Sequence, residues 1–183
     1  FAISSSRSLP SFAHTTLSRQ ARRFPQVSQR VDTVLFLSDA FTEYFHPGAG
    51  MAAVRTLHAA GYQAVLLPVL GAGRTLISKG FLDAARRHAE RLLTKIRQYD
   101  SSGQLAILGV EPSEIYTLTD EYADLFPGDA EVQGLAQRAW MVDEFLLRPD
   151  PEGRRRHRRP GPPTRAPPRP VADRPMSHRR CRR

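Results

Sequence analysis

Residues 71–80 read Gly71-Ala72-Gly73-Arg74-Thr75-Leu76-Ile77-Ser78-Lys79-Gly80. They directly follow the apolar run Ala64-Val65-Leu66-Leu67-Pro68-Val69-Leu70 and lead into a long amphipathic segment. A turn with two glycines therefore stands where a strand would pass into a helix. In α/β folds, ligands bind outside the carboxyl ends of the strands, where loop N–H groups and helix N-termini converge. The turn is accordingly the first candidate in this chain for a functional site.

Short apolar runs and helical periods alternate on both sides of this turn. The apolar runs predict strands at residues 33–37, 64–68 and 105–110, and the helical periods predict helices at residues 51–60, 81–96 and 131–147. Gly61 stands where the C-terminal cap of the first helix is expected. Alternating β and α units imply a parallel sheet with right-handed crossovers. We therefore predict an α/β fold, a small three-layer parallel sheet flanked by helices.

The charge divides the chain near residue 150. Residues 151–183 carry twelve Arg and two acidic residues, whereas residues 1–150 carry fifteen Lys and Arg against sixteen acidic residues. The basic segment also holds eight of the fifteen prolines and the only cysteine, and it has no Leu, Ile, Phe, Tyr or Trp, so it cannot build a core. We predict an extended linker at 1–30, an α/β domain at 31–148 and a disordered Arg/Pro-rich tail at 149–183.

The N-terminal region permits two interpretations. The first 31 residues contain no Asp or Glu among many Ser, Thr and Arg, a composition that organellar transit peptides share. Pro10 and the lack of a sustained helical period favour a linker cut from a longer protein, and the first residue, Phe1, also suggests a fragment. No apolar run approaches the roughly 20 residues of a membrane span, so we expect the domain to be soluble.

Polar loops follow each of the three predicted strands. Because the carboxyl ends of parallel strands meet at one edge of a sheet, we expect these loops to converge on one crevice. The alternative is that their residues only form turns and cap helices. The candidate crevice residues are Asp39, Thr42, Tyr44, Gly71, Gly73, Arg74, Ser78, Lys79, Glu111, Ser113 and Glu114.

Several segments carry a resemblance to a known family. Residues 33–44 read TVLFLSDAFTEY, residues 61–85 read GYQAVLLPVLGAGRTLISKGFLDAA, residues 109–125 read GVEPSEIYTLTDEYADL and residues 143–146 read DEFL. In this order they resemble the first cysteine-rich, Cys-Cys-Gly repeat of FAD-linked oxidases fused to an iron-sulfur region, a family that includes D-lactate and glycolate oxidising enzymes. Residues 7–12 resemble the linker before that repeat, so the resemblance covers about residues 5–148.

The chain departs from that family at the cysteines. Gly71-Ala72-Gly73-Arg74 stands where such proteins carry Cys-Cys-Gly-Arg, and Glu111-Pro112-Ser113-Glu114 stands where they carry Glu-Pro-Ser-Cys. Iron-sulfur clusters require thiolate ligands, which neither motif retains. We therefore expect no catalytic residue, no metal site and no cofactor bound by this chain. The resemblance implies FAD and an iron-sulfur cluster for the parent protein only.

Other chemistry has weaker support. The turn opens like a dinucleotide-binding fingerprint, but Leu76 occupies the position of the third glycine. Arg74, Ser78 and Lys79 could bind a phosphate or carboxylate, although solvation and capping are favoured for them. Glu111 and Glu114 could form an acid–base pair, but a residue in a first helical turn more often complements the helix dipole. We expect His88 to pack beside Ala85 and Leu92.

We therefore predict a fragment of an FAD-linked, iron-sulfur-associated oxidoreductase of 2-hydroxy acids, with this part a non-catalytic structural and docking repeat. Its partners would be the missing FAD and iron-sulfur portions of the same protein and an electron-acceptor protein. The resemblance implies a cytoplasmic location, or a peripheral one at the inner face of the membrane.

The alternative is a small basic protein that contacts nucleic acid or an anionic membrane through its tail. We expect nucleic acid not to be a partner. A run limited largely to Arg, Pro, Gly, Ala and His is what GC-rich DNA gives in the wrong reading frame, so an out-of-frame tail is our preferred interpretation.

Overall fold

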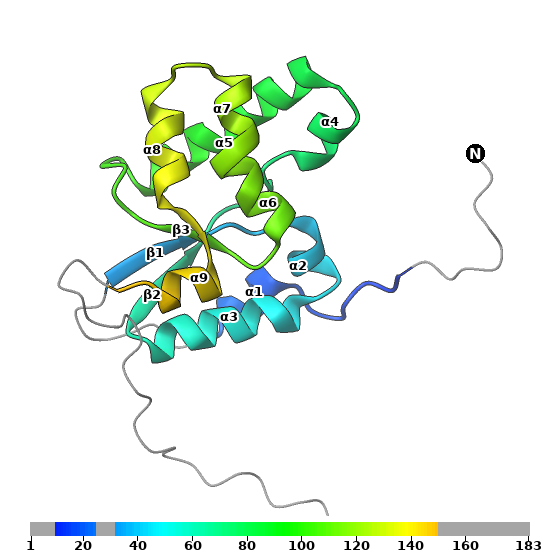
Figure 1. The fold of residues 1–183 in the computed structure, drawn as a ribbon. Coiled ribbons are helices and arrows are strands. Elements are labelled where there is room, and N and C mark those ends of the chain that lie inside the picture. The colour runs from blue at the N-terminus through cyan, green and yellow to red at the C-terminus, as the bar shows by residue number, and fades with distance from the viewer. Residues whose placement is uncertain (1–9, 25–31, 150–183) are drawn as a thin grey trace, which may run out of the picture.

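The computed structural model describes residues 10–24 and 32–149 (Figure 1). Residues 1–9 and 25–30 of the predicted linker and residues 150–183 of the predicted tail therefore lie outside the described residues. The elements in chain order are α1 (Leu17–Ala21), β1 (Asp32–Phe36), α2 (Ala40–Tyr44), α3 (Pro47–Ala59), β2 (Tyr62–Leu66), α4 (Arg74–Ser78), α5 (Leu82–Tyr99), β3 (Ile107–Gly109), α6 (Pro112–Tyr116), a π-helical turn η1 (Thr117–Glu121), α7 (Tyr122–Leu125), α8 (Ala130–Arg138), β4 (Ala139–Met141) and α9 (Val142–Leu147).

The sheet has the strand order β2-β1-β3-β4, and every pair is parallel. The register places Leu35 beside Val65 on one side and beside Ile107 on the other. The prediction of a parallel α/β sheet is confirmed. The predicted strands at 33–37, 64–68 and 105–110 correspond to β1, β2 and β3, with ends that differ by up to two residues.

Strand alternation divides the core between the two faces of the sheet, because successive side chains point to opposite faces. Leu35 and Leu37 pack with α5 and the helices from α6 to α8. Val34 and Phe36 pack with α1, α3 and α9. Figure 1 shows the same arrangement, with helices on both sides of the sheet. The three layers that the sequence predicts are therefore present.

The predicted helix at 131–147 is wrong in one respect, because the chain there forms α8, β4 and α9. Ala139 has an extended backbone, with φ −95° and ψ 127°, and it pairs with Ile107 at the edge of the sheet. Val132 and Leu135 are buried on one face of the sheet, whereas Val142 and Phe145 are buried on the other. The apolar faces of α8 and α9 continue one helical spacing in the sequence. The pattern therefore predicted one helix, although the two helices pack on opposite faces of the sheet.

The predicted linker also contains structure within residues 10–24. Leu17 begins α1, is fully buried and packs against the α3 side of the sheet. Thr16 caps this helix by accepting a hydrogen bond from the Arg19 amide. Leu17 makes an extended, unpacked conformation unfavourable for this segment, because it buries its apolar side chain against the domain.

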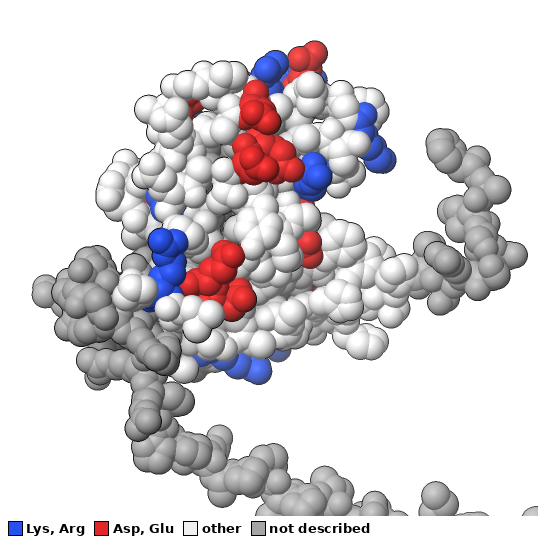
Figure 2. Space-filling model, in the orientation of Figure 1, with Lys and Arg blue, Asp and Glu red and all other residues white. Residues whose placement is uncertain are grey.

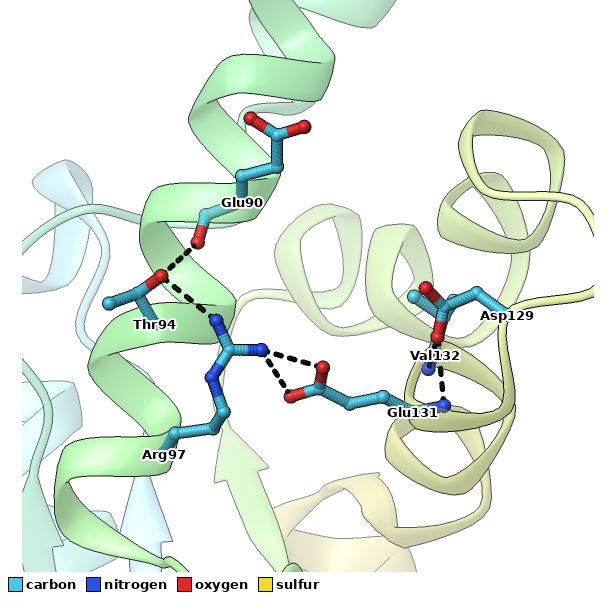
Figure 3. A network of polar contacts seen from close by, with 6 residues as sticks. All are labelled: Glu90, Thr94, Arg97, Asp129, Glu131 and Val132. Carbon is cyan, nitrogen blue, oxygen red and sulfur yellow. Dashed lines mark hydrogen bonds and ion pairs between the residues drawn. The ribbon is translucent and has the colours of Figure 1, made fainter.

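Polar contacts join α5 to α8 on the outer side of the molecule (Figure 3). The Arg97 guanidinium donates to both carboxylate oxygens of Glu131, at 2.8 and 2.6 Å, and to the Thr94 hydroxyl at 3.0 Å. Asp129 caps α8 by accepting hydrogen bonds from the amides of Glu131 and Val132. The start of α8 is thereby fixed against α5.

Candidate functional site

The candidate site lies at the carboxyl edge of the sheet, where β1 leads into α2 and β3 leads into α6. Asp39 follows β1 and is buried, with 2% of its surface exposed. Its carboxylate accepts hydrogen bonds from the Phe41 amide at 2.7 Å, from the Thr42 amide at 2.9 Å and from the Thr42 hydroxyl. Asp39 and Thr42 are therefore engaged in capping α2.

The loop that follows β2 has a backbone that only glycine fits. Gly71 has φ 64° and Gly73 has φ 83°, values that other residues rarely adopt. A Cβ atom on Gly71 would lie 2.8 Å from the Glu114 carboxylate, and one on Gly73 would lie 2.8 Å from the His88 ring. The loop is thus closely enclosed by side chains from α5 and α6.

Three side chains from three different helices hold this loop by hydrogen bonds. The Ala72 amide donates to the Glu114 carboxylate. The Tyr122 hydroxyl donates to the Ala72 carbonyl oxygen at 3.0 Å, and His88 Nε2 donates to the Gly71 carbonyl oxygen at 3.1 Å. The loop backbone is therefore satisfied inside the molecule, as a buried polar segment requires.

The electrostatics of the site centre on Glu114. Burial raises the pKa of its carboxyl group above the ordinary range, and the neighbouring carboxylates of Asp39 and Glu111 raise it further. The Ala72 amide and His88 oppose this shift. Burial and the charge of Glu114 also raise the pKa of the Tyr122 hydroxyl, which therefore remains a hydrogen-bond donor.

The structure thus brings Gly71, Ala72 and Glu114 into contact, and it places Asp39 and Glu111 close enough to act on Glu114 electrostatically. Gly71, Ala72 and Glu114, the positions at which the sequence resemblance predicts cysteine, therefore lie together. The residues present do not fit a thiolate-bound cluster, because the Glu114 carboxylate is engaged with a backbone amide and Ala72 has no ligand atom.

The other candidate residues are engaged in separate contacts or exposed to solvent. Ser113 donates to Glu111, which caps α6, at 2.8 Å through its hydroxyl. Arg74 pairs with Glu121 at 3.0 Å, and the Ser78 hydroxyl donates to the Thr75 carbonyl oxygen at 3.2 Å. Lys79 is exposed at the end of α4, and the carbonyl oxygen of Tyr44 accepts a hydrogen bond from the Ala13 amide.

Sequence reasoning missed two residues of the site. His88 and Tyr122 both touch the glycine loop, although each lies on the apolar face of a helix and gives the pattern of a core residue. Their ring nitrogen and hydroxyl are the only sign that they have polar partners. Among residues 10–24 and 32–149, no group of three or more His, Cys, Asp and Glu side chains is arranged to hold a metal ion.

The acidic residues of the second half of the domain are partly neutralised, because Asp100, Glu121 and Glu131 pair with Arg138, Arg74 and Arg97. Residues 98–137 contain eight Asp and Glu and no Lys or Arg. Figure 2 shows acidic side chains gathered over the upper helices and again near α9. Residues 98–137 themselves offer no Lys or Arg to neutralise a phosphate backbone.

A groove of about 490 Å³ lies at the opposite edge, at the amino ends of the strands. Thr33, Tyr62, Arg138 and Trp140 are among the residues that line it, and the Arg148 guanidinium lies 3.8 Å from the centre of the Trp140 ring. Nothing in the sequence pattern indicated this groove. Within the described part of the chain, no helix combines the length and the apolarity that crossing a membrane requires.

The chain is similar in sequence to larger oxidoreductases. No family model matches the chain, and no solved structure matches it. The matches described below support a relationship to the FAD-linked oxidoreductases.

The chain is similar to three proteins named D-2-hydroxyglutarate dehydrogenase. The protein of Escherichia coli is 31% identical over 123 residues, which are 66% of this chain and 12% of the relative. The protein of Pantoea ananatis is 27% identical over 126 residues, 62% of this chain and 12% of the relative. That of Pseudomonas putida is 26% identical over 116 residues, 63% of this chain and 11% of the relative. The chain thus matches about one-eighth of the length of these curated relatives.

Proposed function

We propose that this chain is a fragment of an FAD-linked, iron-sulfur-associated oxidoreductase that oxidises a 2-hydroxy acid, and that it acts there as a structural and docking unit. The observation that supports this proposal most strongly is the similarity to three D-2-hydroxyglutarate dehydrogenases over about two-thirds of the chain. The substrate class we propose is therefore a D-2-hydroxy dicarboxylic acid.

The catalytic groups would belong to the rest of the parent protein. Its flavin would accept a hydride equivalent from the 2-hydroxy acid, and its clusters would pass the electrons to an acceptor protein. The residues of this unit instead hold one another. Glu114, Tyr122 and His88 fix the glycine loop, which in the resembled family carries thiols, so hydrogen bonds replace sulfur chemistry at that position. We propose a cytoplasmic location, with peripheral attachment to the inner face of the membrane as the alternative.

A complementation experiment tests this function. The Escherichia coli relative is prepared without the segment of 123 residues that matches this chain, and oxidation of D-2-hydroxyglutarate is measured with and without the purified chain. We expect activity only when both parts are present, and none from the chain alone. Failure to recover activity, with both proteins folded and the flavin retained, would contradict the proposed function.

A second candidate function has one observation in its favour, the twelve Arg of residues 151–183. Such a segment can neutralise phosphates and bind nucleic acid with an affinity that falls steeply with salt. Residues 98–137 of the domain have no Lys or Arg to contribute to such binding. An interaction that is specific and survives physiological salt would favour this second function.

A further inference from the structure

Aromatic side chains from two distant segments form one exposed surface beside the candidate site. Phe12, Phe41 and Tyr44 are exposed to 71%, 63% and 41%, respectively. The Phe12 ring stacks on the Phe45 ring with 4.8 Å between centroids, and the Phe41 ring lies 6.0 Å from Phe45. We call Phe12, Phe41, Tyr44 and Phe45 the aromatic face.

Polar contacts hold the two segments of the aromatic face in place. The Ala13 amide donates to the Tyr44 carbonyl oxygen at 2.8 Å. The buried carboxylate of Glu43 accepts hydrogen bonds from the Ser18 amide at 3.0 Å and from the Ser18 hydroxyl at 2.5 Å, which joins α1 to α2. The aromatic rings therefore have a fixed scaffold, and a partner would have little to order on binding.

Exposed aromatic side chains that gather on one surface usually mark an interaction site. The unfavourable free energy of exposing these rings to water is removed only when another apolar surface covers them. The relatives are about eight times longer than the matched segment, so in such a protein a much larger portion of the same chain is present to cover an exposed apolar surface of this unit. Residues 1–9 join the domain at Pro10, two positions from Phe12, so a domain tethered through them would meet the aromatic face at high effective concentration.

We propose that the aromatic face is the surface through which this unit packs against the remaining portion of its own oxidoreductase. The partner would present a complementary patch of aliphatic or aromatic side chains with a polar rim. This inference rests on the proposed function, since it names the surface by which the docking occurs. Phe41 and Tyr44 of the aromatic face lie on α2, which Asp39 caps at its N-terminus, so the face lies beside the candidate site.

The test uses the full 183-residue chain and the Escherichia coli relative without its matching segment. Affinity is measured by calorimetry for the unaltered chain, for Phe12→Ser/Phe41→Ser and for Leu147→Ser. Leu147 is 76% exposed on α9, outside the aromatic face, and is the matched control. We expect the double variant to bind at least about tenfold more weakly and the control to bind like the unaltered chain. Circular dichroism of each variant checks folding, which these exposed positions should not affect.

The outcomes separate this inference from the proposed function. Equal binding by the unaltered chain and the double variant would overturn the aromatic face as the docking surface and leave the docking function standing. No binding by any folded form of the chain would overturn both. Sedimentation of the chain alone gives a third result. A dimer that the double substitution abolishes would show that the face joins two copies, and would overturn our assignment of the partner.

Discussion

Glu114 shows how one residue type changes what a scaffold can do. The sequence resemblance predicts a thiol at this position, whereas here a carboxylate accepts a hydrogen bond from the Ala72 amide. The carboxylate is half-buried and lies near Asp39 and Glu111, so its charged form is disfavoured. The same side chain thus contributes a hydrogen bond to the loop and an electrostatic cost to the fold.

Replacing Glu114 by Gln should remove a dependence of stability on pH. The folded-state pKa of Glu114 lies above the ordinary value of 4.5, so its favourable contribution is complete below that value and is lost as the pH rises through the raised pKa. Glutamine has no such titration, and its amide oxygen can still accept the Ala72 amide. Urea unfolding at pH 7 and pH 5 measures this. We expect the unaltered protein to gain more stability on acidification than Glu114→Gln.

The exposed Glu90→Gln on α5 is the control for the loss of one negative charge, and it should keep the pH dependence of the unaltered protein. Glu114→Ala separates the hydrogen bond from the charge. It leaves the Ala72 amide without its acceptor and should cost about 1–3 kcal/mol. An unchanged pH dependence in Glu114→Gln would mean that the Glu114 carboxyl group is not shifted in the folded protein.

Alanine at the loop glycines should destabilise the fold. Gly73→Ala places a Cβ atom 2.8 Å from the His88 ring in a left-handed backbone, and we expect a cost of at least about 1–2 kcal/mol in the free energy of unfolding. Gly134 is the matched control, because it lies inside α8 with nothing within 4 Å of its Cβ position. Gly134→Ala should stabilise by about 0.5–1 kcal/mol. Urea unfolding of both variants decides the matter, and equal effects would contradict the close enclosure of the loop.

At the scale of elements, the sequence predicts helices and strands that have a local apolar pattern, and it misses those that form only through pairing in the sheet. The helix α5 was predictable because its apolar residues follow one helical period, and the strands β1, β2 and β3 were predictable because each lies in a short apolar run. The strand β4 was not predictable, because residues 139–141 fit the helical spacing of their neighbours. They are extended because they pair with β3, and this pairing cannot be read from the local sequence. Likewise, loop order predicted that Asp39, Gly71 and Glu114 share an edge, but contacts of His88 and Tyr122 depend on helix orientation.

Two ion pairs that join the C-terminal end of α5 to α8 should differ in strength because they differ in burial. Asp100 is 5% exposed and accepts hydrogen bonds from Arg138, Ser102 and the Leu105 amide. Burial acts to raise the pKa of Asp100, but these hydrogen bonds and the Arg138 charge lower it overall. Asp100→Asn leaves the Arg138 charge without its partner and should cost about 3 kcal/mol. Arg97→Gln on the exposed pair of Figure 3 should cost less than about 1 kcal/mol.

Denaturant unfolding at pH 7 compares these two variants. Stability depends on pH through Asp100 in the opposite sense to Glu114. The lowered pKa of Asp100 means that its carboxylate stabilises the fold above the ordinary value of 3.8. This stabilisation is lost as the pH falls through the folded-state pKa. The difference in the free energy of unfolding between Asp100→Asn and the unaltered protein should therefore become smaller in strong acid. Comparable costs for the two pairs at pH 7 would show that burial does not distinguish them.

At the scale of the whole chain, the described domain and the basic segment have little in common. The domain buries a continuous core on both faces of one sheet. Residues 151–183 offer Arg and Pro and almost no apolar surface. Folding free energy comes mainly from apolar burial, so we expect the domain to account for the stability of the chain.

Deleting residues 151–183 should leave the thermal midpoint of the domain unchanged within error, because twelve Arg repel one another and eight Pro restrict the backbone without adding apolar surface to bury. The same deletion should abolish any binding to nucleic acid at low salt. Differential scanning calorimetry and a salt titration with duplex DNA measure the two effects.

The DNA that encodes the chain, read one base over from about codon 149, should restore a cysteine-containing continuation. A clearly lower midpoint after deletion, with no such continuation in any frame, would make the basic segment genuine structure and would place the nucleic-acid-binding function ahead of the oxidoreductase fragment.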